Sequence, residues 1–360
     1  MYVHERNDWP NFKWNADFIS TKLGNVRHRQ GRILGQMQGL GFRLQEEAML
    51  KTLTMDVIKS SEIEGEFLNP EQVRSSIARR LGIEIAGTIA AERNVEGIVE
   101  MMLDATQRYD AALTDERLFD WHAALFPTGR SGMYKIKVGS WREGGMQVTS
   151  GLMGKETLHY EAPVAEKVAA EMFRFLEWME TEQDLDAVLK AAIAHLWFVT
   201  IHPFDDGNGR IARAIADLQL ARADESKQRF YSMSAQIQAE RNNYYGILES
   251  TQKGDLDITP WLEWFLDCLM RSMEQTDETI AKTLARAKFW ETYRDTDLNI
   301  RQHKVLGMLL DDFFGNLSVS KYAKITKTST DTALRDLQDL TKKGILQQEG
   351  SGRGTHYKLQ

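Results

Sequence analysis

The chain has 360 residues, a net charge of −7 and a pI of about 5.7, with 42% hydrophobic and 27% charged residues. This length is enough for two or three domains with their own cores, and the acidic balance excludes a chain-wide electrostatic footprint for nucleic acid. The single cysteine, Cys268, excludes an internal disulfide and favours a reducing, cytoplasmic location. Because the N-terminus lacks a hydrophobic segment and no run of about 18 apolar residues exists, we expect neither a signal peptide nor a membrane span.

Only 6 prolines and a hydrophobic spacing near 3.6 residues predict a mainly α-helical fold. Helices fill most of residues 1–110 after an aromatic-rich start, and a new unit begins near Glu116. Residues 134–152, YKIKVGSWREGGMQVTSGL, are the clearest strand candidate, and their Gly pair predicts a hairpin. Helices then resume and continue to about residue 275.

The run EEAMLKTLTMDVIKSSEIEG predicts a helix over about residues 45–65 that a glycine ends. Leu53, Val57, Ser60 and Glu64 fall on one stripe of this helix. The apolar stripe therefore ends in a hydroxyl and a carboxylate. A negative charge in the last turn is disfavoured by roughly 0.3–1 kcal/mol, so the pattern favours a cationic partner for the glutamate.

The stretch HPFDDGNGRIAR, residues 202–213, carries the chemistry. Gly207 and Gly209 lack a Cβ, so the amides of Gly207, Asn208 and Gly209 are expected to form an anion-binding nest ahead of a new helix. Arg210 and Arg213 are three residues apart, so they share a face of that helix and can bind phosphate oxygens.

Two further side chains complete this stretch. Asp206 is a hard oxygen ligand suited to Mg²⁺ between phosphates, and His202 has a pKa suited to remove a proton from an attacking hydroxyl. Together these residues predict a nucleotide phosphate-transfer site. It differs from a P-loop, because the chain has no G-x-x-x-x-G-K-[ST] motif.

At these residues the sequence resembles Fic domain proteins, whose motif H-x-F-x-[DE]-G-N-G-R-x-x-R is matched at every fixed position. The resemblance implies protein adenylylation, in which AMP moves from ATP to a hydroxyl side chain of a target protein or of the enzyme itself and pyrophosphate is released. His202 would be the base and Asp206 the Mg²⁺ ligand. Asn208 with the glycine amides, Arg210 and Arg213 would hold the phosphates.

The resemblance also implies roles outside the motif. Gly144–Gly151 lies where these proteins have a β-hairpin flap, so Gln147, Val148 and Thr149 would align the target by strand addition. Tyr244, Tyr245 and Gln252 would lie beside the adenine, although helix packing is an equal alternative for Tyr245.

The segment SSEIEG, from Ser60 to Gly65, matches the family's inhibitory motif [ST]-x-x-x-E-[GN]. Glu64 would pair with Arg213 and keep ATP out of its reactive pose, so the enzyme would inhibit itself. The same glutamate could also support removal of AMP from a target, and the sequence does not decide whether it has this second role. His195, seven residues before His202, is interpreted as a core histidine rather than a support for the site.

The last residues predict a helix, a strand-like segment NLSVSKYAKI, a second helix and a pair of strands, in that order. This order predicts a winged helix-turn-helix. Residues 299–360 carry ten Lys/Arg and six Asp/Glu, a net charge of +4. Lys327, Arg335 and Arg353 could contact DNA, so a transcriptional regulator is one alternative function. A Fic enzyme that transfers another phosphate-containing group is the other.

These patterns predict four parts: an N-terminal helical domain, a catalytic domain, a helical connector and a winged-helix domain, at residues 1–112, 113–272, 273–298 and 299–360. The N-terminal and C-terminal domains offer surfaces for a homodimer. The predicted partners are ATP with Mg²⁺ and an unidentified target protein, without a membrane.

Overall fold

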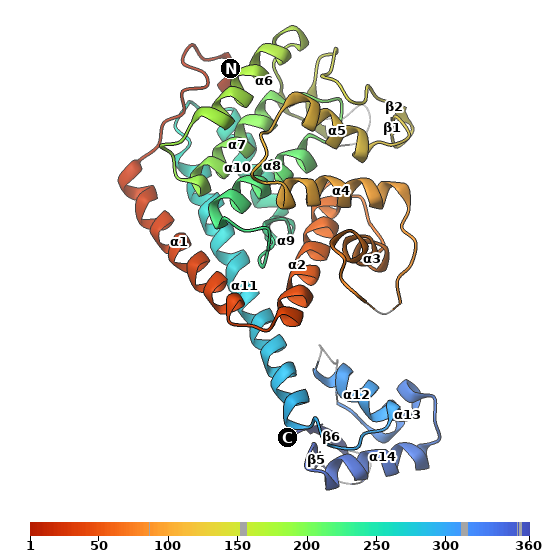
Figure 1. Ribbon diagram of the computed structural model, residues 1–360. Coiled ribbons are helices and arrows are strands. Elements are labelled where there is room, and N and C mark those ends of the chain that lie inside the picture. Colours follow the sequence, from red (N-terminus) through yellow and green to blue (C-terminus); the bar gives the residue numbers. More distant parts are fainter. Residues whose placement is uncertain (86, 152–156, 311–315, 351, 353–354) are drawn as a thin grey trace. The chain divides into compact units, whose positions relative to one another are not determined.

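The computed structural model describes residues 1–360 except 86, 152–156, 311–315, 351 and 353–354. It divides into two compact units, Met1–Asp277 and Glu278–Gln360 (Figure 1). The described part is mainly helical with small two-stranded antiparallel sheets, which confirms the predicted fold class.

The first unit is built from helices whose bounds follow the chain. They are α1 (Ala16–Gln38), α2 (Phe42–Ile63), α3 (Pro70–Leu81), α4 (Arg93–Gln107), α5 (Asp115–Leu125), α6 (Ala165–Thr181), α7 (Ala187–Ile201), α8 (Asn208–Asp224), α9 (Met233–Ala239) and α10 (Arg241–Gln252), preceded by a short 3₁₀ helix, η1 (Val3–Glu5). Helix α11 (Thr259–Thr292) begins in this unit and continues into the second.

Helix α7 is the centre of the first unit. It is apolar on all sides, and its residues from Val188 to Ile201 are buried, as expected for a helix enclosed by others. Asp186 caps its start by accepting a hydrogen bond from the Val188 amide at 2.8 Å. Helix α8 packs closely against α7, and α2 packs against α9 beside them (Figure 1). The loop between α7 and α8, which carries the Fic-like motif, is therefore held on a rigid pair of helices.

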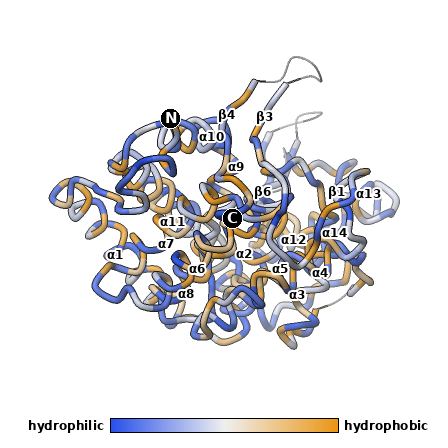
Figure 2. The backbone as a smooth tube through the Cα atoms, turned by 90° about the horizontal axis from the view of Figure 1, so that it is seen from above, coloured by the Kyte–Doolittle hydropathy of each residue, from blue (hydrophilic) through white to orange (hydrophobic). Residues whose placement is uncertain are grey.

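Two short hairpins lie between α5 and α6. Strands β1 (Arg130–Ser131) and β2 (Tyr134–Lys135) form the first, and β3 (Gln147–Ser150) and β4 (Thr157–Glu161) form the second, which extends from the body of the unit in Figure 2. The prediction of one hairpin within residues 134–152 was wrong in its extent. The Gly pair precedes β3 rather than forming the turn, and the partner strand lies beyond the predicted range.

The second unit has helices α12 (Ile300–Leu310), α13 (Val319–Thr326) and α14 (Thr330–Lys342), and strands β5 (Leu346–Glu349) and β6 (His356–Leu359). The prediction of a strand at NLSVSKYAKI was wrong. Ser318 accepts a hydrogen bond from the Lys321 amide and caps a helix, and only Leu317 pairs with a strand residue, Tyr357. Three helices followed by a hairpin are the order expected of a winged helix-turn-helix.

This second unit has its own apolar core. Its buried residues are Val305, Leu306, Leu317, Tyr322, Ala323, Ala333, Leu337, Leu340, Ile345, Leu346 and Tyr357. The three predicted domain boundaries stay predictions, and α11 runs unbroken through the one placed at residues 272–273. None of the described helices combines the length and apolar character that a membrane span requires.

Candidate active site

His202 ends α7 in a left-handed conformation, with φ of +52° and ψ of +59°. Its Nδ1 lies 3.1 Å from the carbonyl oxygen of Val199, so Nδ1 carries the proton and donates it. Nε2 is then the unprotonated nitrogen. Burial, followed by the charge of Arg142, lowers the pKa of His202 below its usual value of 6.5, although a backbone hydrogen bond to Val199 acts in the opposite direction. The imidazole is therefore neutral and able to accept a proton near neutral pH.

Phe204 and Asn208 fix the shape of the loop that follows. Phe204 is fully buried and stacks on His122 with ring centroids 4.2 Å apart. The Asn208 side chain accepts from the Phe204 amide at 3.0 Å and donates to the Phe204 carbonyl at 2.8 Å. These two hydrogen bonds hold the Asn208 side chain against the loop at the first position of α8.

The predicted anion-binding nest falls at the N-terminus of α8. Gly207 precedes the helix with φ of +80°, and a Cβ there would lie 2.9 Å from the Phe126 ring. At Gly209, a Cβ would overlap the carboxylate of Glu64. An anionic group of the chain itself thus occupies the helix N-terminus, where partial positive charge favours anions.

Arg213 meets both predicted inhibitory residues. Its Nη2 donates to the Glu64 carboxylate at 2.7 Å and to the Ser60 carbonyl at 2.8 Å, and its Nε donates to the Ser60 hydroxyl at 2.9 Å. Only 2% of the Arg213 side chain is exposed. Its buried Nη1 has no hydrogen-bond partner among the described residues.

Glu64 lies just past the end of α2 rather than within its last turn. Its carboxylate side chain is 31% exposed, while Ser60 and the apolar residues of the same stripe are buried. Gly65 has φ of +80° and turns the chain, which brings Glu66 back towards α8. The Glu64 side chain therefore lies between the buried end of α2 and the start of α8.

Glu66 is a contact that the sequence analysis missed. Its carboxylate accepts from Arg210 Nη1 at 2.6 Å, and the Arg210 guanidinium also lies 5.1 Å from the centre of the Phe126 ring. Arg210 is only 7% exposed, and its buried Nε has no partner among the described residues. No motif marks Glu66, and its acidic character two residues after Glu64 is the only signal it offers.

Asp206 lies in the loop close to the hairpin β1–β2. It accepts hydrogen bonds from the Ser131 hydroxyl and from the Gly207 amide, the latter at 2.6 Å. The described residues include no cluster of three or more potential metal ligands. A single carboxylate fits Mg²⁺, which is usually held by one or two carboxylates together with substrate phosphates.

The three predicted adenine-side residues lie on α10 in different environments. Tyr244 is buried, and its hydroxyl lies 2.9 Å from Nε2 of His195, whose pKa burial lowers to about 3. Gln252 is buried and donates weakly to Val199 and Thr200 at 3.3–3.5 Å. Tyr245 is the one with an exposed ring, at 38%.

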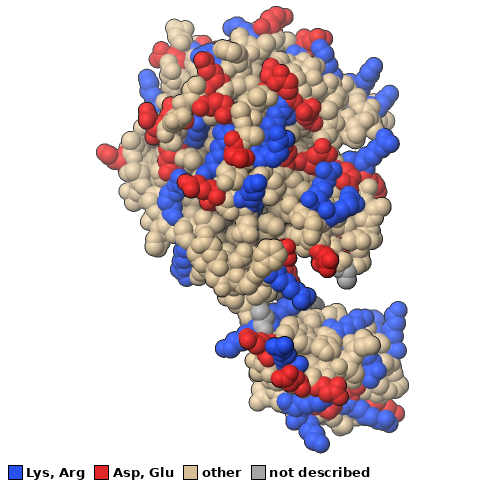
Figure 3. All heavy atoms as spheres, viewed as in Figure 1, with Lys and Arg blue, Asp and Glu red and all other residues tan. Residues whose placement is uncertain are grey.

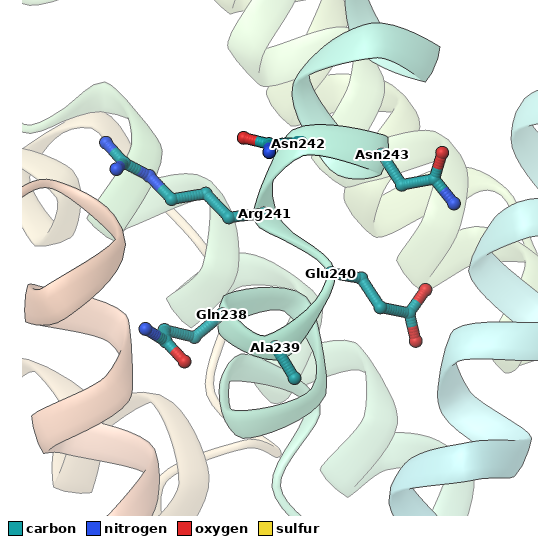
Figure 4. A pocket seen from close by; sticks show the side chains of 6 residues that line it. All are labelled: Gln238, Ala239, Glu240, Arg241, Asn242 and Asn243. Carbon is teal, nitrogen blue, oxygen red and sulfur yellow. The ribbon is translucent and has the colours of Figure 1, made fainter.

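A shallow cavity of about 430 Å³ lies at the junction of α9 and α10, lined by residues 238–243 (Figure 4). Glu240 and Arg241 point in opposite directions from it. Glu240 pairs with Arg271 of α11 at 2.6 Å, and Arg241 lies 5.4 Å from the centre of the Tyr245 ring. On the face shown in Figure 3, acidic and basic side chains are interspersed over the first unit rather than gathered in one field.

The predicted target-aligning residues all lie on β3. Val148 pairs with Tyr160 and Thr149 with Leu158, with an irregularity between the two pairs. The Gln147 side chain donates to Glu161 at 3.2 Å. These pairs use one edge of β3, and the described residues form no ladder on its other edge.

Two family models match separate parts of the chain. Residues 112–220 match the model of the Fic/DOC family, and residues 2–83 match a domain of unknown function, DUF4172. Proteins named protein adenylyltransferase Fic from Culex quinquefasciatus and Drosophila grimshawi are each 35% identical over 105 residues. That is 29% of this chain and 19–20% of theirs, so the chain spans about a fifth of the length of these relatives.

Solved structures show the same fold at low identity. A Fic family protein from Desulfovibrio desulfuricans matches with a TM-score of 0.54 and 21% identity over 94% of this chain and 96% of its own. Fic-1 from C. elegans (residues 134–508) matches with a TM-score of 0.51 and 20% identity over 74% of each chain.

Proposed function

On the premise that this chain carries a Fic domain, we propose that it is a protein adenylyltransferase that moves AMP from ATP to a hydroxyl side chain and is held inactive by Glu64. The observation that carries the proposal is the pairing of Glu64 with Arg213 at the N-terminus of α8, directly after the loop of His202. An anion site, two buried guanidinium groups and a neutral histidine are the parts that phosphate transfer needs.

The chemistry follows from the tautomer and the charges. Nε2 of His202 accepts the proton as the target hydroxyl oxygen bonds to the α-phosphorus, and the bond to the pyrophosphate oxygen breaks. Arg210, Arg213 and the α8 amides stabilise charge on the phosphates. Asp206 would hold Mg²⁺, which when bound neutralises phosphate charge. The free edge of β3 would align the target backbone.

Inhibition follows from the position of one carboxylate. Glu64 occupies the helix N-terminus at Gly209 and uses a donor of Arg213, so the phosphate chain of ATP and this carboxylate compete for the same groups. Positioning supplies most of the rate in phosphoryl transfer, and a displacement of about 1 Å can cost about 10²-fold. Displacing Glu64 should therefore activate the enzyme.

The test is intact-mass analysis after incubation with ATP and Mg²⁺. Glu64→Gly should gain one AMP unit by self-modification, roughly 10²-fold faster than the wild type. His202→Ala in the same background should gain none. Equal labelling of wild type and Glu64→Gly would overturn the inhibition, and a gain equal to a phosphate would replace AMP by another transferred group.

Glu62→Gln provides a matched control for Glu64→Gln. Glu62 lies two residues earlier, and its carboxylate pairs with Lys59 of the same helix at 2.6 Å. Both substitutions remove one negative charge from the same segment, but only Glu64→Gln removes the ion pair with Arg213. Labelling should rise with Glu64→Gln and stay at the wild-type level with Glu62→Gln. Reversal is tested on modified protein, where loss of AMP should require Glu64.

A further inference from the structure

Arg142 lies just before the hairpin β3–β4 and is only 2% exposed. Its guanidinium makes short hydrogen bonds to three backbone carbonyls: Nε donates to His202 at 2.8 Å, Nη1 to Gly144 at 2.7 Å, and Nη2 to Pro163. Nη2 also donates weakly to the Ile201 carbonyl at 3.5 Å. Its own amide donates to the carbonyl of Pro203 at 2.9 Å. Among the described residues, no carboxylate lies within ion-pair distance of it, and Asp205 and Glu166 act on it only through longer-range charge. A buried guanidinium satisfied by carbonyls alone needs a structural reason.

The positions of those carbonyls supply the reason. Gly144 precedes β3 and Pro163 follows β4, so the two carbonyls flank the base of the hairpin, one on the side of each strand. The amide of Ala162 donates to Met146 at 3.0 Å and closes the hairpin at its base. The third carbonyl belongs to His202, at the C-terminus of α7, where the helix dipole favours a cation. The planar guanidinium of Arg142 therefore joins the two chain segments at the base of the hairpin to the backbone of His202.

We propose that Arg142 is a positioning residue that fixes the β3–β4 hairpin relative to His202, and so sets where an aligned hydroxyl meets its base. The inference rests on the proposed function. Lysine cannot replace the residue fully, because an ammonium is a point charge and lacks the fork that reaches three carbonyls at once. Tyr160 supports the same contact from β4, since its hydroxyl donates to the Thr200 carbonyl at 2.7 Å.

The charge of Arg142 gives a second consequence that can be measured separately. The groups that act on the His202 charge are Arg142 from the hairpin side, Glu64 after α2 and Asp206 in the loop. Arg142 disfavours the protonated imidazole and the two carboxylates favour it. Removing Arg142 should raise the pKa of His202, so the acidic limb of the activity profile should move to higher pH.

The experiment compares Arg142→Met and Arg142→Lys in the Glu64→Gly background. Amide hydrogen exchange should accelerate at least about tenfold in residues 146–150 and 157–162 in both variants, while α8 stays protected. In the pH profile of self-labelling with ATP, the acidic limb should move to higher pH for Arg142→Met. It should stay unchanged for Arg142→Lys, because lysine keeps the positive charge. The KM for ATP should stay the same, because Arg142 makes no contact with Arg210 or Arg213.

Arg117→Met is the matched control. Arg117 is also buried and donates to backbone carbonyls away from the hairpin, those of Ala111, Ala112, Asp104 and Arg108, and unlike Arg142 it also pairs with the Asp104 carboxylate at 2.6 Å. It should alter neither hairpin exchange nor the pH profile. Unchanged hairpin exchange in both Arg142 variants, or acceleration spread equally over α7 and α8, would overturn the proposal. If the Met variant does not fold, exchange in the Lys variant decides the matter. Exchange needs no activity, so absent labelling would refute only the proposed function.

Discussion

At the scale of single residues, the first two arginines of α8, Arg210 and Arg213, are each held by one carboxylate from the segment that follows α2. Glu64 and Glu66 are separated by Gly65, whose φ of +80° turns the chain between them. Arg210 and Arg213 share one helical face three residues apart, so the two pairs lie next to each other. Releasing Glu64 alone leaves Arg210 in its pair with Glu66.

Glu66→Gln should therefore raise self-labelling by itself, by less than Glu64→Gln does, because Glu64 also blocks the N-terminus of α8. We expect an effect of about threefold to tenfold, and a larger one when the two substitutions are combined. Initial labelling rates of the two single variants and the double variant form the cycle that measures this coupling. If Glu66→Gln labels itself at the wild-type rate, the pair of Glu66 with Arg210 does not restrict the binding of ATP.

The pH dependence of the reaction follows from His202. A base must be unprotonated, and burial lowers the pKa of this imidazole below 6.5 in the folded protein. The active form is therefore fully present at neutral pH and is lost as pH falls through this lowered pKa. Labelling by Glu64→Gly, measured from about pH 4.5 to 8.5, should keep its plateau below pH 6.5. A loss of activity centred above pH 6.5 would contradict the tautomer and burial described for His202.

At the scale of elements, α2 carries the inhibitory segment and is tied to α9 by one buried acid. Asp56 accepts hydrogen bonds from the Ser232 hydroxyl and from the Ser234 amide, the latter at 3.2 Å. Asp56→Ala would leave these donors unpaired, which typically costs about 1–3 kcal/mol. The free energy of unfolding should fall accordingly, and self-labelling should rise because α2 holds Glu64 less firmly.

The measurements for this prediction are urea unfolding and hydrogen exchange of α2. Glu62→Ala, which loses only its pair with Lys59, should leave both close to the wild type. If Asp56→Ala lowers stability without raising labelling, α2 does not control the inhibitory carboxylate through its contact with α9.

Local elements could be predicted from the sequence better than contacts between distant residues, because local backbone requirements are marked by nearby residue types. The 202–213 motif could be placed on a helix, a loop and a second helix because glycine and proline mark backbone requirements locally. The meeting of Ser60 and Glu64 with Arg213 came from a family resemblance. Arg142 could not be identified, since its role depends on carbonyls of residues up to 60 positions away. The helix Val319–Thr326 was misread because Ser318 acts as a cap rather than a strand residue.

At the scale of the whole molecule, the residues of the candidate site all belong to the unit Met1–Asp277. The second unit has a separate core, so neither core requires the other to form. A Glu64→Gly chain that ends after residue 298 keeps α11 intact and should label itself within about twofold of the full chain. A loss of labelling with an unchanged melting temperature would show that the second unit takes part in catalysis.

The second unit also decides the alternative of DNA binding. Arg335 is exposed on α14, but Arg301 pairs with Asp336 at 2.7 Å, and Lys343 pairs with Asp339, so part of its positive charge is used internally. Lys327 ends α13 in a left-handed conformation, and Arg353 lies outside the described residues. A net charge of +4 over residues 299–360 leaves few cations for phosphates, and affinity falls steeply with salt when it depends on such contacts.

We therefore expect the full chain to give no gel shift with duplex DNA at about 150 mM salt, and at most a weak, sequence-independent shift at low salt. Arg335→Glu should leave the result at the higher salt unchanged. A shift that persists at that salt, depends on sequence and disappears with Arg335→Glu would contradict this prediction. It would assign α14 to a DNA groove, because base-edge contacts resist salt better than phosphate contacts and are lost when the side chain that makes them is reversed in charge.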